Sequence, residues 1–173
     1  GRTIRKFFFP LHECDDSLER SALLEQRTMP ELPEVETVCR GLRPKLEGHV
    51  LVDVIQRRLD LRFPLPENFA ERLQGRTIER IDRRAKYILA HLDDGWTLIA
   101  HLGMSGRMNL TDEAPPAADK HDHIEFRTDE GTIVRFNDPR RFGSMDLIRT
   151  AELNAHPILA SLGPEPLSNS FNE

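Results

Sequence analysis

Short stretches of alternating apolar and polar residues fill the sequence from His49 to Ile148, and turn residues interrupt them at intervals. Because successive side chains of a β-strand point to opposite faces, this two-residue period predicts strands with one buried face. Asp94-Gly95 and Glu130-Gly131 stand where hairpin turns belong. We expect strands over residues 50–54, 96–102, 108–110, 123–127, 132–136 and 144–148, and over 77–92 as one long strand or two paired strands.

Two helices are expected beside these strands. Pro33 suits the first position of a helix, where its missing N–H costs nothing, and Glu34 and Glu36 place negative charge in the first turn. The apolar positions that come next at helical spacing, before Gly48, are Val35, Val38, Leu42 and Leu46. A short helix is expected over 67–73, and a surface loop over 112–120. The predicted fold class is α+β, mainly β: a two-layer β-sandwich or flattened barrel flanked by helices.

Length and composition favour one ordinary soluble domain. The 173 residues carry a formal net charge of −5, and 38% of them are hydrophobic. Cys14 and Cys39 are too few for a disulfide framework or a four-cysteine zinc site, which indicates a reducing, cytoplasmic setting. The apolar run over residues 7–11 is far too short to span a membrane.

The acidic net charge hides an uneven distribution. Residues 57–86 contain nine Lys and Arg against five acids, whereas residues 87–173 contain seven against fourteen. A polyanion would therefore meet one basic face of the molecule. The alternative explanation is an ordinary solvated strand and helix.

The first 28 residues differ from the rest of the chain. Their five basic and five acidic residues cancel, and they show no long helical or strand period. We expect residues 1–28 to be an extension, tag or leader outside the fold, and residues 29–173 to form the domain.

The stretch from Met29 to Glu36 allows two interpretations. Proline and glutamate are favoured at a helix start in any protein. Alternatively, removal of Met29 would make Pro30 an N-terminal secondary amine, partly neutral and nucleophilic at pH 7. Attack of that amine on a sugar C1′ would expel a base and leave an iminium, from which the 3′ phosphate can be eliminated. Glu31 could then act as general acid at the sugar oxygen.

Two loops between strands are candidates for DNA contact. In HLGMSG, Met104 between glycines is either part of an ordinary hairpin or an apolar wedge for a base stack. In DPRRFG, the Asp-Pro pair is either a simple turn, or Arg140 and Phe142 fill the gap that a flipped base leaves.

Two basic motifs complete the set. In RRAKY, an extended strand would align Arg84 and Lys86 with Arg80 as a row of cations for phosphates. In KHDH, His121 and a second histidine flank one aspartate, but on a strand the aspartate would face away from the two histidines, so a phosphate contact is favoured over a metal site.

Together the motifs PELPEVET, RRAKY, HLGMSG, KHDH, DPRRFG and LGPEPLS resemble the N-terminal catalytic domain of formamidopyrimidine-DNA glycosylase, from Met29 to the last residue. PELPEVET and GMSG resemble this enzyme more than its relative endonuclease VIII. The resemblance implies a two-layer β-sandwich and base-excision repair of oxidised purines in double-stranded DNA, with glycosylase and abasic-site lyase activities, by a monomer.

The resemblance also implies roles for single residues. Pro30 corresponds to the proline that forms the Schiff base, Glu31 to the proton donor, and Glu34 to a second acid of the motif. Lys86 corresponds to the lysine of phosphate contact and β-elimination. His101 and His121 correspond to DNA-contacting histidines, and Met104, Arg140 and Phe142 to residues inserted where the damaged base is turned out.

The sequence departs from the family in two respects. The family continues into a helix, two-turn, helix module and a four-cysteine zinc finger, and no cysteine follows Cys39, so we expect no zinc and no other cofactor in this chain. While residue 29 remains attached, the Pro30 nitrogen is a tertiary amide and cannot attack C1′. The competing hypotheses are an inactive fragment or degenerate domain that at most binds DNA, and an unrelated β-sandwich binding module.

Overall fold

The computed structural model describes residues 31–156 and residue 159, with side chains from residue 33 onward. The chain divides into two units, residues 1–34 and 35–173. Of the first unit, only the start of helix α3 (Glu31–Leu46) is described. The expected extension over 1–28, Pro30 and the LGPEPLS segment lie outside the described residues. Among the described residues, the strands and the remaining helices all belong to the second unit.

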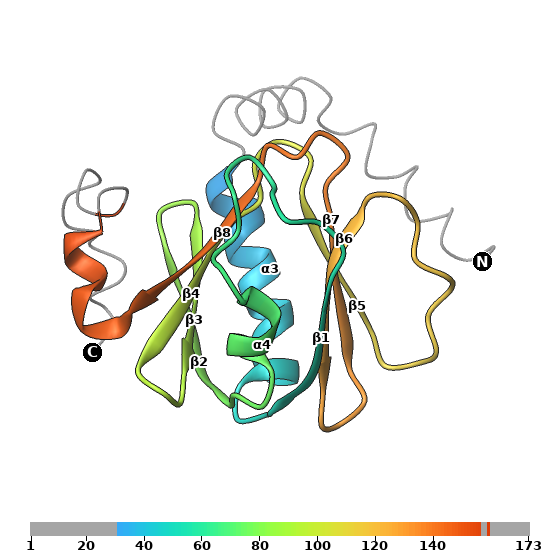
Figure 1. Cartoon of the computed structure of the whole chain (residues 1–173), viewed down its shortest axis with the longest axis horizontal. Helices are drawn as coiled ribbons and strands as arrows, with labels where there is room; N and C mark the ends of the chain where they lie inside the picture. Colours follow the sequence, from blue (N-terminus) through green and yellow to red (C-terminus); the bar gives the residue numbers. More distant parts are fainter. Residues whose placement is uncertain (1–30, 157–158, 160–173) are drawn as a thin grey trace, which may run out of the picture. The chain divides into compact units, whose positions relative to one another are not determined.

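Antiparallel strands form two four-stranded sheets, seen on either side of Figure 1. One sheet has the order β1-β6-β7-β5 and the other the order β2-β3-β4-β8. The predicted two-layer, mainly β fold is therefore confirmed. The strands are β1 (Leu51–Gln56), β2 (Ile78–Arg84), β3 (Tyr87–Leu92), β4 (Trp96–His101), β5 (Arg107–Thr111), β6 (Asp122–Thr128), β7 (Ile133–Asn137) and β8 (Ser144–Arg149).

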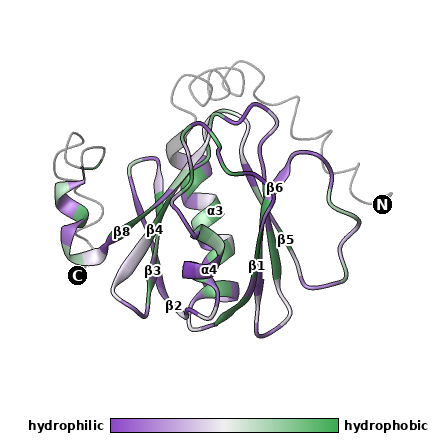
Figure 2. Cartoon of the chain, viewed as in Figure 1, coloured by the Kyte–Doolittle hydropathy of each residue, from purple (hydrophilic) through white to green (hydrophobic). Residues whose placement is uncertain are grey.

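One large apolar core joins the two sheets with α3 and the short helix α4 (Phe69–Leu73). Figure 1 shows both helices between the sheets, and Figure 2 shows apolar residues along the strands and helices around this core. The predicted buried face of α3 is confirmed at Val35, Leu42 and Leu46, with Cys39 added to it. Each such buried side chain contributes roughly 1.5–3 kcal/mol through removal from water. No helix in the described part of the chain is long and apolar enough to cross a membrane.

The start of α3 differs from the prediction. The helix begins at Glu31, so Pro33 occupies its third position and not its first. Proline is tolerated there because the first four N–H groups of a helix have no carbonyl partner within it.

One strand prediction needs correction, and one open alternative is settled. A bulge between Leu51 and Asp53 shifts the alternation of β1, so that Leu51 and Val54 are buried while Val52 is 51% exposed. Of the two alternatives for residues 77–92, two paired strands are confirmed: β2 and β3 pair, and Ala85 and Lys86 make the turn between them. The 3-10 helix η1 (Thr150–Ala155), which follows β8, was not expected.

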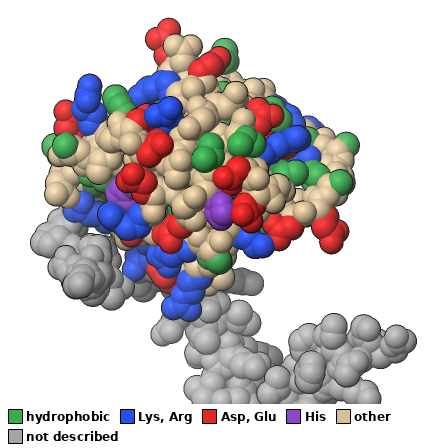
Figure 3. Space-filling view, turned by 90° about the horizontal axis from the view of Figure 1, so that it is seen from below, with side chains coloured by type: hydrophobic (Ala, Val, Ile, Leu, Met, Phe, Trp, Pro, Cys, Tyr) green, Lys and Arg blue, Asp and Glu red, His purple; other side chains and the backbone are tan. Residues whose placement is uncertain are grey.

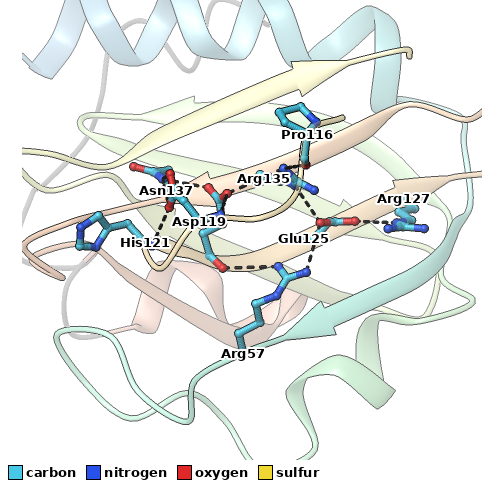
Figure 4. Close-up of polar contacts among 9 residues, drawn as sticks. Arg57, Pro116, Asp119, His121, Glu125, Arg127, Arg135 and Asn137 are labelled. Carbon is cyan, nitrogen blue, oxygen red and sulfur yellow. Dashed lines mark hydrogen bonds and ion pairs between the residues drawn. The ribbon is translucent and has the colours of Figure 1, made fainter. Parts of the chain in front are cut away.

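A buried carboxylate on β6 faces away from the core. The neighbours of Glu125 along the strand, Ile124 and Phe126, belong to the core, whereas Glu125 itself lies among arginines (Figure 4). Its oxygens accept from Nε of Arg127 at 2.6 Å and from Nε of Arg135 at 2.9 Å. Burial alone would raise the pKa of Glu125, but these two bonds outweigh it and hold the pKa below its ordinary value.

The arginines around Glu125 also connect separate segments (Figure 4). Arg57, which follows β1, lies 3.5 Å from the Glu125 carboxylate and donates to the carbonyl of Asp122. Arg135 donates to the carbonyl of Pro116 at 2.8 Å, in the loop before β6. The network therefore fixes the loop that leads to His121.

We expect Glu125→Gln to lower the free energy of unfolding at pH 7 by about 2–4 kcal/mol, because it leaves several arginines beside an uncharged buried group. The folded-state pKa of Glu125 is lowered, so the contribution of the carboxylate is complete above its ordinary value and is lost as pH falls through the folded-state pKa. Urea unfolding at pH 7 and pH 3 should show a smaller difference at pH 3. Glu130→Gln, at an exposed turn, is the matched control. An equal effect of the two variants would contradict the role of Glu125.

Candidate nucleic-acid interface

Strand register brings three motifs to the same end of one sheet. Tyr87 of β3 pairs with His101 of β4, and His101 pairs with Ser144 of β8. The turn before Tyr87, the loop after His101 and the loop before Ser144 are therefore neighbours. Figure 1 shows these three connections at its upper edge. The opposite end, seen in Figure 3, carries acidic and basic side chains intermixed.

Two of these connections, Leu102–Gly106 and Asp138–Gly143, form what we call the two-loop ridge. The buried carboxylate of Asp138 accepts from the Ser105 hydroxyl at 2.6 Å, from Arg141 N at 3.1 Å and from Gly143 N at 2.8 Å. In turn, Arg140 N donates to the Ser105 hydroxyl at 3.3 Å. One carboxylate thus fixes the conformation of both loops.

Close backbone contact between the loops requires glycine. A Cβ on Gly103 would lie 2.7 Å from the nitrogen of Gly143, and a Cβ on Gly143 would lie 2.7 Å from the carbonyl oxygen of His101. Arg141 adopts a left-handed φ of 56°, which is uncommon for a residue with a side chain and is stabilised here by its bond to Asp138. The loops are therefore packed as one unit.

The ridge exposes three side chains that the sequence predicted. Met104 is 70% exposed and Phe142 is 46% exposed, although large apolar side chains are usually buried. The guanidinium carbon of Arg140 lies 5.8 Å from the centre of the Phe142 ring. The structure thus places an exposed apolar side chain on each of the two neighbouring loops, with the Arg140 cation beside Phe142.

Lys86 occupies a different position from the one expected. It is exposed in the turn after Ala85, whose φ is 53°, so it does not continue the alternation of β2. Arg80 bonds to Asp82 at 2.8 Å and Arg84 to Asn154 at 2.8 Å. The predicted row of cations along one strand face is wrong because the chain reverses at this turn. Lys86 instead projects from the end of the sheet that carries the ridge.

Both candidate histidines are half-buried and contact the ridge through hydrogen bonds. Nδ1 of His101 accepts from Gly103 N at 3.0 Å, and its ring lies 4.9 Å from that of Tyr87. The carbonyl of His121 accepts from Asp138 N at 3.0 Å, and its own N–H donates to Asp119. Nε2 of the buried His123 lies 2.8 Å from the carbonyl oxygen of Asp138. KHDH is thereby joined to DPRRFG.

The acidic residues of the PELPEVET motif are described in part. Glu31 begins α3, its side chain lies outside the description, and Glu34 is exposed. Glu36 accepts from Arg83 at 3.0 Å and from Arg43 at 3.4 Å. Burial acts to raise the pKa of Glu36, but its arginine partners lower it below the ordinary value. This residue connects α3 to β2 just before the Lys86 turn.

Sequence reasoning missed the groups that organise the site. Asp138 was considered only as part of an Asp-Pro turn, and Ser105 was not singled out. The local signal was an acid immediately before a proline, a common turn pattern that does not reveal a partner 33 residues away. Within residues 31–156 and 159, no three His, Cys, Asp or Glu side chains are grouped so that they could hold a metal ion.

Comparison with known proteins identifies the family of the chain. Residues 29–145 match the family model of the formamidopyrimidine-DNA glycosylase N-terminal domain. The chain is 54% identical over 152 residues to the formamidopyrimidine-DNA glycosylase of Ruegeria sp. and 55% identical over 152 residues to that of Ruegeria pomeroyi, covering 84% of this chain and 54% of each relative. The chain thus spans about half the length of these relatives.

Solved structures give the same result. The formamidopyrimidine-DNA glycosylase of Lactococcus lactis, non-covalently bound to DNA containing an abasic site, is similar with a TM-score of 0.68 and 34% identity, over 79% of this chain and 52% of that one. The protein from Thermus thermophilus is similar with a TM-score of 0.66 and 38% identity, over 82% and 49%. The expected resemblance is confirmed, and the chain belongs to the formamidopyrimidine-DNA glycosylase family.

Proposed function

We propose that this domain excises oxidised purines, such as 8-oxoguanine and formamidopyrimidines, from double-stranded DNA and cleaves the resulting abasic site. The observation that carries the proposal is the two-loop ridge, which presents Met104, Arg140 and Phe142 together. An enzyme that acts on a base must turn it out of the stack. Apolar tips beside a cation suit this task, because they can occupy the vacated space while the guanidinium bonds to the orphaned base.

The chemical step is assigned to the start of the domain. The nitrogen of Pro30, when it is N-terminal, attacks C1′ of the damaged nucleotide. The C1′–base bond breaks, and the departing base takes up the proton that the proline nitrogen loses. Glu31 donates a proton to the sugar oxygen as the ring opens, and Glu34 is the second acid of the motif. The resulting iminium withdraws electrons from C2′, which loses a proton as the 3′ phosphate leaves.

The remaining residues are assigned to DNA binding. Lys86 contacts a phosphate and assists β-elimination, and His101 and His121 contact the backbone around the ridge. We propose that the protein acts as a monomer on cytoplasmic DNA and that this chain uses no metal of its own. The Lactococcus lactis homologue was crystallised with DNA containing an abasic site, which supports damaged double-stranded DNA as the proposed substrate.

Covalent trapping with borohydride tests the role of Pro30. A chain that begins at Pro30 should form an adduct with abasic-site DNA, because borohydride reduces the iminium to a stable amine. A chain that begins at Met29 is one residue longer than the Pro30 chain. It should form no adduct through Pro30, since its Pro30 nitrogen is an amide. Denaturing gel electrophoresis measures the adduct. Equal adduct from both chains, or none from a Pro30 chain that binds the same DNA, would refute the assignment. Binding without an adduct would favour a DNA-binding domain without catalysis.

Asp138→Asn tests whether the ridge is held by its buried carboxylate. The amide NH₂ of Asn would face N–H or O–H donors, so at least one of them loses its acceptor, at a cost of about 1–3 kcal/mol in stability. We expect the preference for abasic-site over intact duplex to fall about 10-fold, measured by fluorescence anisotropy. Asp94→Asn, with the same change in charge at the opposite end, should keep that preference. Retained preference in Asp138→Asn would show that the carboxylate does not organise the DNA-contacting surface.

A further inference from the structure

The loop between β1 and α4, residues 57–66, exposes two large apolar side chains. Leu59 is 83% exposed and Phe63 is 53% exposed. Five large apolar side chains are exposed in the described part of the chain: these two, Met104 and Phe142 of the two-loop ridge, and Val52 on β1. Exposed apolar side chains therefore concentrate on the ridge and on this loop. Grouping of this kind marks an interaction site more often than isolated exposure does.

A hydrogen bond and an ion pair connect the 57–66 loop to the two-loop ridge. The backbone N–H of Arg62 donates to the carbonyl of Gly143 at 3.0 Å. A guanidinium nitrogen of Arg141 lies 3.9 Å from the Asp60 carboxylate. Figure 1 shows the loop running along the same upper edge as the ridge loops. A partner that covers Phe142 would therefore lie beside the 57–66 loop.

The loop is ordered by its own backbone and by buried anchors. Leu61 N donates to the carbonyl of Phe63 at 2.9 Å, and Leu65 N donates to the carbonyl of Leu59 at 3.0 Å. Leu61 and Leu65 are buried in the core. The apolar tips are thus presented by a folded loop, which reduces the entropy lost when a partner binds.

The charge of the loop indicates which partner fits. Three arginines and the single acid Asp60 lie between residues 57 and 63, in a chain whose net charge is −5. Arg57 lies at the Glu125 carboxylate and Arg58 bonds to Asp60 at 2.9 Å, so Arg62 is the cation of this loop that faces a partner. Arg62 is exposed, lies 5.3 Å from the centre of the Phe63 ring and makes no ion pair within the described residues. A DNA backbone presents phosphates for cations and deoxyribose carbons for apolar groups. Two apolar side chains are far too few for a stable protein interface, which buries about 800 Å² on each partner.

We infer that the 57–66 loop is a second DNA-contacting element, which binds the sugar–phosphate backbone next to the site of base extrusion. Arg62 pairs with a phosphate, and Leu59 and Phe63 pack on neighbouring deoxyribose rings. This inference rests on the proposed function, because it requires a duplex on the ridge. The loop contacts backbone and not bases, so it strengthens binding to damaged and intact duplex alike.

The test is binding of the 173-residue chain to a duplex with a tetrahydrofuran abasic-site analogue and to the intact duplex, across a range of salt concentrations. Phe63→Ala should weaken binding to both duplexes about 5-fold without changing the salt dependence. Arg62→Ala should reduce the slope of log affinity against log salt by about one. The matched controls are Val52→Ala, an exposed apolar residue on β1, and Arg76→Ala, which makes the same change in charge near the opposite end.

The outcomes separate this inference from the proposed function. Unchanged affinity in Phe63→Ala, or a slope for Arg62→Ala equal to that of Arg76→Ala, overturns the role of the loop. If Arg140→Ala lowers the preference for the abasic-site analogue while the loop variants leave binding unchanged, the proposed function stands without the loop. Failure of the unsubstituted chain to bind either duplex overturns both. A dimer in sedimentation that dissociates in Leu59→Ala would assign the loop to self-association and overturn the inference.

Discussion

The buried carboxylate of Asp138 is the group on which the candidate site depends. It accepts from a side chain of one loop and from two backbone N–H groups of the other, and its own backbone bonds to the segment that carries His121. A buried carboxylate without these donors would be costly, so each bond both stabilises the charge and fixes a loop. The same carboxylate bonds to both of the loops that expose Met104 and Phe142.

The sheet supplies what this anchor needs. Because β3, β4 and β8 are consecutive neighbours, their ends place the Lys86 turn and both ridge loops side by side, although these segments are spread along the chain between residues 86 and 143. Glu36 ties α3 to β2 near the same end, and the Glu125 arginines fix the segment that leads to His121. Three carboxylates, each surrounded by donors, thus position groups that come from distant parts of the sequence.

Much of this could be predicted from the sequence, and the rest depended on tertiary contacts. Alternation identified the strands, and the motifs identified Met104, Arg140 and Phe142 as exposed candidates, because local patterns report which face a residue occupies. The bulge in β1 and the position of the turn at Lys86 could not be seen, since a β-branched run and a basic strand look the same with or without them. Asp138 and Ser105 escaped notice because their pairing is non-local, and the 57–66 loop because its anchor is the carbonyl of Gly143.

If the two loops held by Asp138 form one surface that meets DNA, their backbone amides should respond to DNA as a unit. The measurement is the change in backbone amide NMR chemical shifts while the chain is titrated with a duplex that carries a tetrahydrofuran abasic-site analogue. We expect the amides of Gly103, Ser105, Arg141 and Gly143 to shift together, at the same DNA concentrations. Shifts confined to the opposite end, around residues 94–95, with the ridge amides unmoved, would contradict a DNA-binding role for the ridge.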